Sequence, residues 1–293
     1  MKNNIFTVER NFRVGDEHES IANVRVFLDR LGYIAPPEET TMGALSEFGS
    51  GLSEAVRKYQ RFHGLEVTGV INEETRQVME MPRCGIADLE EGEEVPEVAS
   101  FVASGGKWPS NQLTYKFVSG TGDLPEETER EILRQALDAW AEVTPLTFTE
   151  VSGSADAAIL ISWVTGDHGD GSPFDGPGHV LAHAFFPPPV NPHPGIAGDM
   201  HFDEAETWAT THGGGNIDLL SVAIHELGHA LGLRHSSVSE AIMFPTYSGV
   251  KRTLASDDIQ GIQSIYGEPG EPEVPLSWFE RLIQWIRRLF GLG

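Results

Sequence analysis

The sequence predicts an α+β protein in which a small all-α domain precedes a larger domain of strands and helices. Two observations carry this prediction. Apolar residues recur at helical spacing between residues 16 and 80, whereas strand-like and helical segments both follow residue 100. The length of 293 residues also exceeds what one core comfortably supports. We expect a helical domain over 1–80, a connecting segment over 81–100, a larger mixed domain over 101–267 and a separate C-terminal segment over 268–293.

The composition limits the classes of partner and cofactor. A formal net charge of −24 and the absence of a basic stripe exclude nucleic acid as a partner. The many carboxylates are available as oxygen ligands for calcium. Residues 1–20 contain no apolar run long enough for a recognisable signal peptide, and no stretch approaches the length of a spanning helix.

The N-terminal region is predicted to contain three helices. The segments "ESIANVRVFLDRLGY" and "LSEAVRKYQRFHG" place apolar residues on one helical face, and Gly64 ends the second. A third helix follows in "TGVINEETRQVM", with Asn72 as its N-cap. The three segments together resemble the peptidoglycan-binding-like fold. This resemblance implies cell-wall glycan as a partner, and a helical bundle that has lost such binding is the alternative.

The region after the helices divides into a linker and a mixed domain. "DLEEGEEVPEVAS" is acidic and carries Pro96, so it is predicted to be an exposed linker and a site of proteolytic cleavage. "NQLTYKFV" and "AAILISWV" are strand-like, and "EETEREILRQALDAWAEV" has an apolar helical face. The segment 167–216 is rich in Gly, Pro, His and Asp. So long an irregular segment requires ligands such as metal ions to order it.

The last segment, "LSWFERLIQWIRRLFGLG" at 276–293, predicts a basic amphipathic helix with tryptophans on its apolar face. This pattern is typical of helices that lie on a membrane surface. A helix docked on its own protein is an equal alternative.

The strongest chemical signal is "AIHELGHALGLRH" at 223–235. On a helix, His225 and His229 lie on one face and can hold one zinc ion, with Glu226 beside them as general base. Gly232 can end the helix, so that His235 supplies a third ligand. Three protein ligands leave a fourth position open, as in catalytic zinc sites.

The extended spacing, with Met243 following in "EAIMFPTY", is the metzincin signature. From about Phe101 to Gly267 the chain resembles a matrixin, a member of the matrix-metalloproteinase family, with its pro-domain before it. The resemblance implies a zincin fold with a twisted mixed five-stranded sheet and three helices. It also implies a secreted-type zinc endopeptidase, made as a latent zymogen, that uses a zinc-activated water. The implied structural zinc ligands are His168, Asp170, His183 and His201, and the implied calcium ligands are Asp175, Asp203, Glu206 and the backbone carbonyls of Gly176, Gly178 and Val180.

The same resemblance implies how substrate binds. "VLAHAFF" would be an edge strand that pairs with an extended peptide, through the carbonyl of Ala182 or Ala184. Pro245 and Tyr247 would wall the pocket for the side chain after the scissile bond. Ser221 would set the depth of that pocket, and its small size predicts a roomy one. His193 is expected to be a loop residue and no ligand.

Cys84, the only cysteine, lies in "MPRCGIAD". The resemblance implies that its thiolate occupies the fourth position on the catalytic zinc until the pro-segment is removed, which makes the enzyme latent. We expect Arg83 and Asp88 to pair and shape this loop. Ala87 stands where the family usually has proline, which predicts a less rigid loop.

Two functions from different classes follow. The first is a latent zinc endopeptidase acting on protein or peptide substrates, and the second is a catalytically inactive cell-wall or surface-binding protein. Glu226 and all three histidines of the motif are present, which favours the enzyme. Calcium at millimolar concentration is found outside cells, so an extracellular or cell-surface location is the better prediction.

Overall fold

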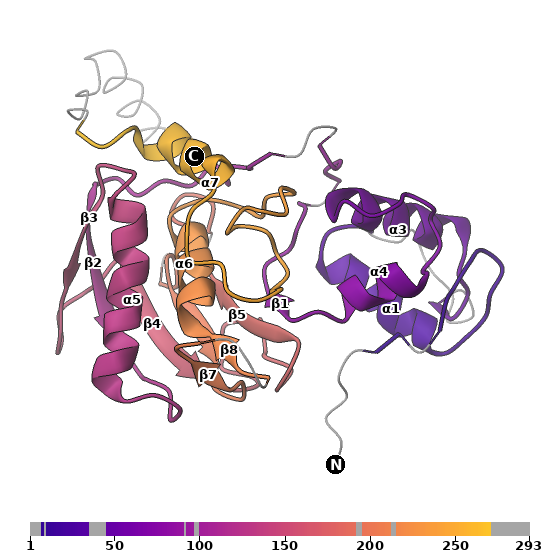
Figure 1. The fold of residues 1–293 in the computed structure, drawn as a ribbon, viewed down its shortest axis with the longest axis horizontal. Coiled ribbons are helices and arrows are strands. Elements are labelled where there is room, and N and C mark those ends of the chain that lie inside the picture. The colour runs from indigo at the N-terminus through magenta and orange to yellow at the C-terminus, as the bar shows by residue number, and fades with distance from the viewer. Residues whose placement is uncertain are drawn as a thin grey trace, which may run out of the picture.

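The computed structural model describes residues 7–8, 10–34, 45–90, 92–96, 100–191, 195–211 and 215–270 (Figure 1). The predicted amphipathic helix at 276–293 and the predicted loop residue His193 lie outside these residues. Within the described part of the chain, no helix is long and apolar enough to cross a bilayer.

The N-terminal region is helical, as predicted. Its helices are α1 (Ser20–Arg30), α3 (Ser50–Phe62) and α4 (Glu73–Met79). Their apolar faces meet in one buried cluster, and the expected N-cap forms because the Asn72 side chain accepts a hydrogen bond of 2.9 Å from the Thr75 amide. Gly64, just after α3, has φ of 68°, which lets the chain turn out of the helix.

The second region is built on a six-stranded sheet in the order β1-β5-β6-β4-β2-β3 (Figure 1). Neighbouring strands are parallel except β5 and β6, so the sheet is mixed as predicted. The strands are β1 (Arg83–Cys84), β2 (Gln112–Phe117), β3 (Thr147–Glu150), β4 (Ile159–Val164), β5 (Val180–Ala184) and β6 (Met200–Asp203). A separate pair consists of β7 (Trp208–Ala209) and β8 (Ile217–Asp218).

The sheet has one strand more than the five that the sequence predicts. Five strands come from the chain after residue 101, and the sixth, β1, comes from the connecting segment that carries Cys84. β1 pairs with β5, the strand expected to accept an extended peptide. The additional strand therefore occupies the edge that the sequence assigns to substrate.

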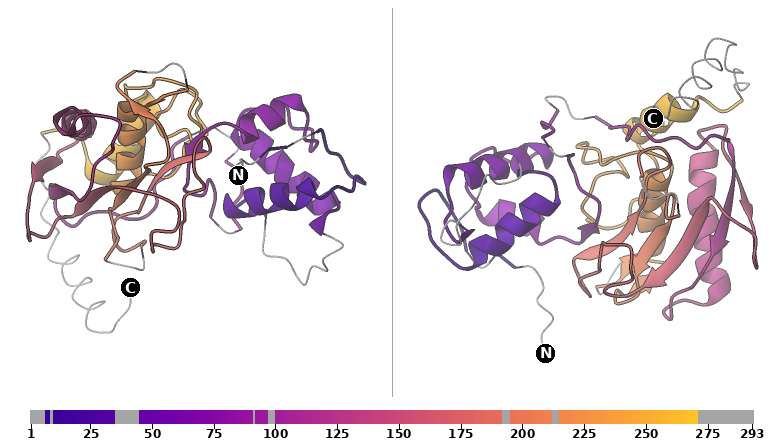
Figure 2. Two further views of the ribbon diagram at one scale, coloured as in Figure 1. Left: turned by 90° about the horizontal axis from the view of Figure 1, so that it is seen from below. Right: turned by 180° about the vertical axis from the view of Figure 1, so that it is seen from behind.

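Three helices complete this region: α5 (Glu126–Ala141), α6 (Leu219–Ala230) and α7 (Ser256–Tyr266). α5 and α6 lie together against the sheet, and the helical N-terminal region lies beyond the β1 edge (Figures 1 and 2). The indole of Trp140 on α5 donates a 3.0 Å hydrogen bond to the Ile224 carbonyl on α6. At Gly228 an added Cβ would lie 2.3 Å from the Met243 sulfur, so this close contact requires glycine.

The start of α6 is fixed by Asp218, its N-cap. The buried carboxylate accepts hydrogen bonds from the Ser221 amide at 3.0 Å, from the Ser221 hydroxyl at 2.6 Å and from Arg252 Nε at 3.1 Å. The Asp218 amide in turn donates to the Tyr247 hydroxyl at 2.9 Å. The helix that carries the zinc motif is therefore tied to the loop after it.

We expect Asp218→Ala to lower the free energy of unfolding by roughly 1–2 kcal/mol, because it removes an N-cap. The Arg252 side chain, which is 39% exposed, can be solvated once its partner is gone. Burial would raise the pKa of Asp218, but hydrogen bonds from Arg252 and Ser221 hold it below its usual value. Its contribution is therefore complete above about pH 4 and is lost as pH falls through the lowered folded pKa. Urea unfolding at pH 7 and pH 3 measures both effects. Asp138→Ala, on the exposed face of α5, is the control and should change stability by less than about 0.5 kcal/mol.

Candidate metal centre and substrate cleft

α6 brings the first three residues of the zinc motif together. His225, Glu226 and His229 lie on its buried face. Gly232 then has φ of 108°, and an added Cβ there would lie 2.5 Å from the Gly106 carbonyl oxygen. The chain can turn only through a glycine here, and this turn returns His235 to the other two histidines, as the sequence predicts.

The backbone orients two of these imidazoles. His225 Nδ1 lies 2.7 Å from the Ile242 carbonyl, and His229 Nδ1 lies 2.7 Å from the Leu233 carbonyl. A carbonyl can only accept, so each Nδ1 carries the proton and each Nε2 presents a lone pair. The two Nε2 atoms are 3.1 Å apart. Both therefore point at one position.

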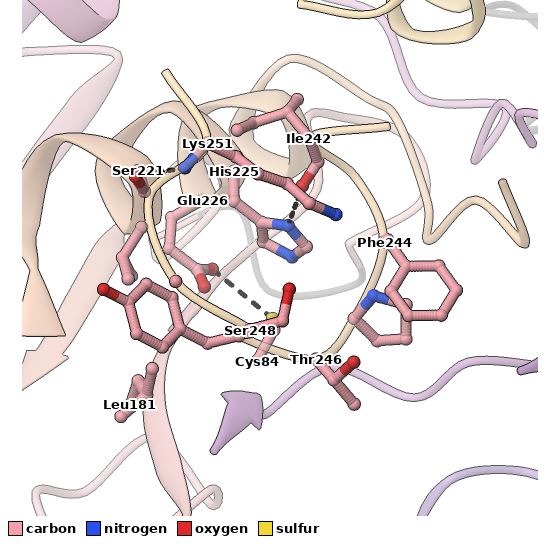
Figure 3. A pocket seen from close by; sticks show the side chains of 14 residues that line it. Cys84, Leu181, Ser221, His225, Glu226, Ile242, Phe244, Thr246, Ser248 and Lys251 are labelled. Atoms are coloured by element: carbon pink, nitrogen blue, oxygen red, sulfur yellow. Dashed lines mark hydrogen bonds between the residues drawn. The ribbon is translucent and has the colours of Figure 1, made fainter. Parts of the chain in front are cut away.

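Cys84, which Figure 3 shows near Glu226 and His225, completes this group. Its sulfur lies 3.5 Å from His229 Nε2 and 3.6 Å from Glu226 Oε2. The ligand atoms of Cys84 and the three histidines all lie within 4.8 Å of one another. In the described part of the chain, His235 Nε2 and Glu226 Oε1 are buried without a hydrogen-bond partner. Three imidazoles and a thiol converging on one point are a donor set that fits zinc.

Burial determines the protonation of this group. It lowers the pKa of His225 to about 3, with help from His235, and it places that of His229 well below its usual value. These imidazoles are neutral, as metal ligands must be. Burial, together with the Glu226 carboxylate, raises the pKa of the Cys84 thiol, and burial raises the pKa of Glu226 to about 8. A divalent cation is the charge that would make the thiolate stable here.

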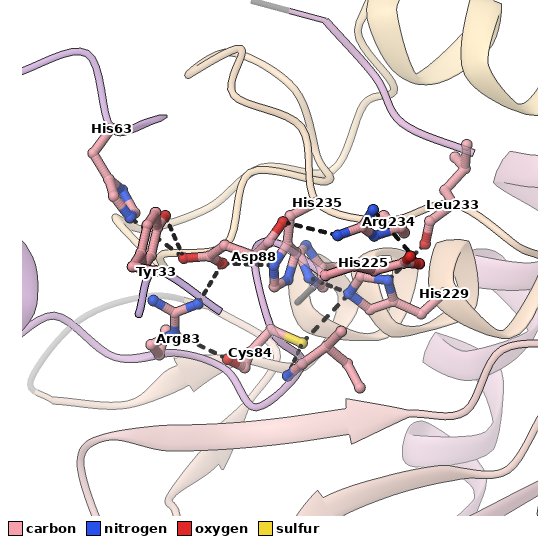
Figure 4. Close-up of polar contacts among 12 residues, drawn as sticks. Tyr33, His63, Arg83, Cys84, Asp88, His225, His229, Leu233, Arg234 and His235 are labelled. Atoms are coloured by element: carbon pink, nitrogen blue, oxygen red, sulfur yellow. Dashed lines mark hydrogen bonds and ion pairs between the residues drawn. The ribbon is translucent and has the colours of Figure 1, made fainter. Parts of the chain in front are cut away.

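Asp88 joins the N-terminal region to the metal centre (Figure 4). Its carboxylate pairs with Arg83 at 2.6 Å, as predicted, and also accepts from His235 Nδ1 at 2.8 Å and from the Tyr33 hydroxyl at 2.8 Å. His63 Nε2 lies 3.7 Å away. Burial opposes ionisation, but Arg83, the hydrogen bond from His235 and the nearby His63 hold the pKa of Asp88 well below its usual range. No sequence pattern indicates the contacts with Tyr33, His63 and His235, because these partners are distant in the chain.

The four predicted structural zinc ligands also meet. Asp170 Oδ2 lies 2.7 Å from His168 Nε2 and 2.8 Å from both His183 Nε2 and His201 Nδ1. Burial lowers the pKa of His183, and burial with the charge of His183 lowers that of His201 to about 4. One carboxylate oxygen surrounded by three imidazole nitrogens fits a second zinc site.

The predicted calcium ligands include three carboxylates, Asp175, Asp203 and Glu206, near the loop that precedes β5. Asp175 and Glu206 accept from the amides of Val180 at 3.1 Å and Gly178 at 2.5 Å. Burial and the nearby carboxylates raise the pKa of Glu206 to about 7, and Asp203 Oδ2 is buried without a recorded hydrogen-bond partner. Carboxylates suit a hard cation such as calcium, but these three are not among the close donor groups in the described part of the chain, so the calcium site stays a prediction.

Gly176 also lies in this loop, where its amide hydrogen-bonds to the Asp203 carboxylate. The roles predicted for the carbonyls of Gly176, Gly178 and Val180 stay predictions.

The predicted cleft is filled by the segment around Cys84. The Gly85 amide donates to the Ala182 carbonyl at 2.8 Å, on the β5 side. On the other side the Cys84 amide donates to the Pro245 carbonyl at 3.0 Å. Ala184, the alternative to Ala182, pairs with Met200 of β6. The segment is thus held by backbone hydrogen bonds to both walls of the cleft.

A pocket opens beside this segment (Figure 3). Pro245, Tyr247 and the buried Ser221 line it, and the Ser221 hydroxyl accepts from the Lys251 amide at 2.9 Å. That this pocket receives a substrate side chain stays a prediction. The side chain of Lys251 also lines the pocket and was missed by the sequence analysis, because no motif includes it. The depth that Ser221 would set stays a prediction.

Comparison with known proteins decides the family. The sequence model of the matrixin peptidases matches residues 107–267, more than half of the chain. The chain belongs to the matrixin family. A model described as a peptidoglycan binding domain matches residues 17–79, so both halves of the predicted fold class are confirmed.

The chain is similar to several matrixins along most of its length. It is 44% identical to stromelysin-1 of Mus musculus over 226 residues, which is 75% of this chain and 44% of that protein. It is 40% identical to matrix metalloproteinase-16 of Homo sapiens over 271 residues, 88% of this chain and 43% of that protein. It is 46% identical to the interstitial collagenase of Equus caballus over 231 residues, 78% of this chain and 45% of that protein. The chain thus spans less than half the length of these relatives.

Matrixins depend on zinc and calcium, and the matrixin domain of this chain offers two zinc donor sets. We expect the purified chain to contain two zinc ions. Replacing His201 by Ala should remove one of them, because His201 contributes only to the Asp170 cluster. Elemental analysis after dialysis measures the ratio, with His18→Ala in the N-terminal region as the control. Two zinc ions retained in the His201→Ala protein would contradict the assignment of the second site.

Proposed function

We propose that this matrixin is a zinc-dependent endopeptidase that is held latent by its own N-terminal segment. One observation carries the proposal. Cys84 lies at the position toward which His225 and His229 point, beside Glu226, in a cleft bounded by β5 and by the Pro245 loop.

The side chains have separate roles in this mechanism. His225, His229 and His235 would hold zinc, which when bound supplies Lewis-acid polarisation of the scissile carbonyl and acidifies a water. Glu226 is buried beside the position of Cys84, and its Oε1 has no recorded partner in the described chain. It is placed to take a proton from the water that replaces the thiol and to pass it to the leaving amine.

Substrate would bind along the path that the pro-segment now takes. The Ala182 carbonyl, which accepts from Gly85, is free to accept from a substrate amide once the segment leaves, and Ala184 offers a second carbonyl on β5. The pocket lined by Tyr247 and Ser221 would receive the side chain after the scissile bond. Burying that side chain would position the bond to be cut.

Latency would rest on the strand β1 as well as on the thiol. β1 is bonded to both walls of the cleft, and the Ile86 amide lies 3.4 Å from the Cys84 sulfur, which it would help to orient. β1 runs parallel to β5. The segment thus fills the cleft with the Cys84 thiol beside Glu226.

Activation would require a cut in the linker before Phe101. The Phe101 amide donates to Asp257 Oδ1 at 2.9 Å. A cut directly before Phe101 would convert this amide into an ammonium group beside a carboxylate. The resulting ion pair would hold the new N-terminus against α7.

The domains, location and partners extend the proposal. We infer domains over 1–80, 81–100, 101–267 and 268–293, and two separate hydrophobic clusters support the first and third of these. Leu89 and Val95 of the connecting segment are buried in the first cluster, so this segment is only partly the exposed linker that the sequence predicts. The calcium loop supports an extracellular site of action on protein substrates. The match to a peptidoglycan binding domain supports glycan as a further partner, and a membrane surface is the partner proposed for 276–293. The inactive surface-binding alternative is not favoured, since Glu226 is retained.

A chelator and one substitution test the activity. After cleavage of the linker, the chain should hydrolyse a quenched peptide, and a zinc chelator should abolish this hydrolysis. Glu226→Gln should lower kcat/KM by about 10²–10⁴-fold, because it removes the proton acceptor but keeps the shape of the side chain. Glu131→Gln on the exposed face of α5 is the control. Hydrolysis unaffected by both chelator and Glu226→Gln would refute the proposal.

Cys84→Ser tests the latency. The uncleaved variant should hydrolyse the same peptide, because a serine hydroxyl is a far weaker zinc ligand than a thiolate. The uncleaved native chain is the reference, and Cys84→Ser combined with Glu226→Gln excludes a contaminating protease. An uncleaved Cys84→Ser protein that stays inactive, although its cleaved form is active, would show that Cys84 does not maintain latency.

A further inference from the structure

Arg234 is a buried arginine next to a metal ligand, and the function proposed above does not use it. It precedes His235 and is only 5% exposed. Its Nη1 lies 2.7 Å from the Glu93 carboxylate and 3.7 Å from that of Glu90, and its Nη2 donates to the Asp88 carbonyl at 3.4 Å. In the described part of the chain, every recorded partner of this guanidinium belongs to the segment 88–93.

These partners leave when the linker is cut and the pro-segment departs. The guanidinium would then stand without these partners, beside the metal-centre residue His235 to which Figure 4 shows it adjacent. The backbone holds Arg234 in place independently of the pro-segment's acidic residues, because its amide donates to the Val102 carbonyl at 2.8 Å. A charge that is fixed at the rim of a cleft, and that binds carboxylates in the latent state, can bind a carboxylate of the next occupant.

The pro-segment shows which side of the metal centre Arg234 serves. Before Cys84 the segment lies along the pocket wall, where Tyr247 donates its amide to the Pro82 carbonyl at 2.7 Å. After Cys84 it passes to the other side and reaches Arg234 through Asp88 and Glu93. The pocket wall receives the residue after the scissile bond in the proposed function. Arg234 therefore faces the part of a substrate that precedes the bond.

We propose that Arg234 determines specificity in the activated enzyme by binding an acidic side chain one to three residues before the scissile bond. The substrate class is thus peptides with Asp or Glu on that side and an apolar residue after the bond. Glu93 holds the same guanidinium in the latent form, so the pro-segment imitates the substrate charge. This inference rests on the proposed function for the direction of the substrate.

The test measures binding and hydrolysis separately. A site for a specific protease is inserted after Pro96, the full chain is cleaved there and the N-terminal fragment is removed. The probes are pairs of octapeptides in which Leu follows the scissile bond. The two members of a pair differ only in having Glu or Gln at one of the three positions before that bond. Their Kd values are measured on the Glu226→Ala chain, which does not consume them, and kcat/KM on the chain with Glu226.

We expect one position at which Glu is preferred over Gln by about fivefold to tenfold in Kd at low salt, and a smaller preference at high salt. Arg234→Gln should bring this ratio to about one, and Arg234→Lys should keep part of it because the charge remains. Arg234→Glu should reverse it in favour of the Gln peptide. The ratio compares two peptides on one protein, so a general loss of affinity cancels. Arg130→Gln on α5, paired there with Glu126, is the matched control and should leave the ratio unchanged.

Two failures are distinguishable. Equal Kd values for Glu and Gln peptides at all three positions, binding of neither peptide, or a preference that persists in Arg234→Gln would overturn the role of Arg234. Absence of chelator-sensitive hydrolysis in the chain with Glu226 would instead overturn the proposed function, while a preference in Kd that requires Arg234 would still support the charge recognition.

Discussion

The structure depends on one electrostatic constraint, the burial of three imidazoles, a thiol and a carboxyl group around a single point. Neutral imidazoles pack there because Nδ1 of His225 and Nδ1 of His229 donate hydrogen bonds to the carbonyls of Ile242 and Leu233. Burial disfavours the charged forms of the Cys84 thiol and of Glu226, and it raises the pKa of both. A divalent cation resolves this conflict. The turn at Gly232, the cap at Asp218 and the pairing of β1 with β5 all serve to bring these groups to the same place.

Asp88 extends this constraint into the N-terminal region. A single buried carboxylate accepts from Arg83 in its own loop, from Tyr33 in the helical region and from His235 at the metal centre. Carboxylate–histidine contacts of this kind orient metal ligands and raise their basicity. Here the carboxylate belongs to the segment that activation would remove. Loss of the pro-segment would therefore remove the hydrogen-bond partner of His235, a proposed zinc ligand. It would also free the position that the Cys84 thiol occupies beside the histidines.

The sequence predicted local features reliably because their physical causes are local. Asn72 caps its helix, Gly64 and Gly232 end theirs, and the apolar face of α5 is buried, since each depends on residues within a few positions. Contacts between residues far apart in the chain could not be predicted in this way. The sixth strand, the acceptors around Asp88, the pocket position of Lys251 and the ion pair of Arg234 with Glu93 all join residues that no helical or strand period connects.

The sequence by itself determined the chemistry of this protein: the three histidines and Glu226 at helical spacing, a single cysteine in a loop before an acidic linker, and the donors for two further metal sites. Ligand type and spacing are properties of the chain, so they can be read along it. Only the tertiary structure decided that Cys84 reaches the metal centre on an added strand of the sheet, and that Asp88 and Glu93 cover His235 and Arg234. Those contacts depend on how two regions, each with its own hydrophobic cluster, pack against each other. Burial and charge complementarity between residues far apart in the chain determine that packing, so no local sequence pattern indicates it.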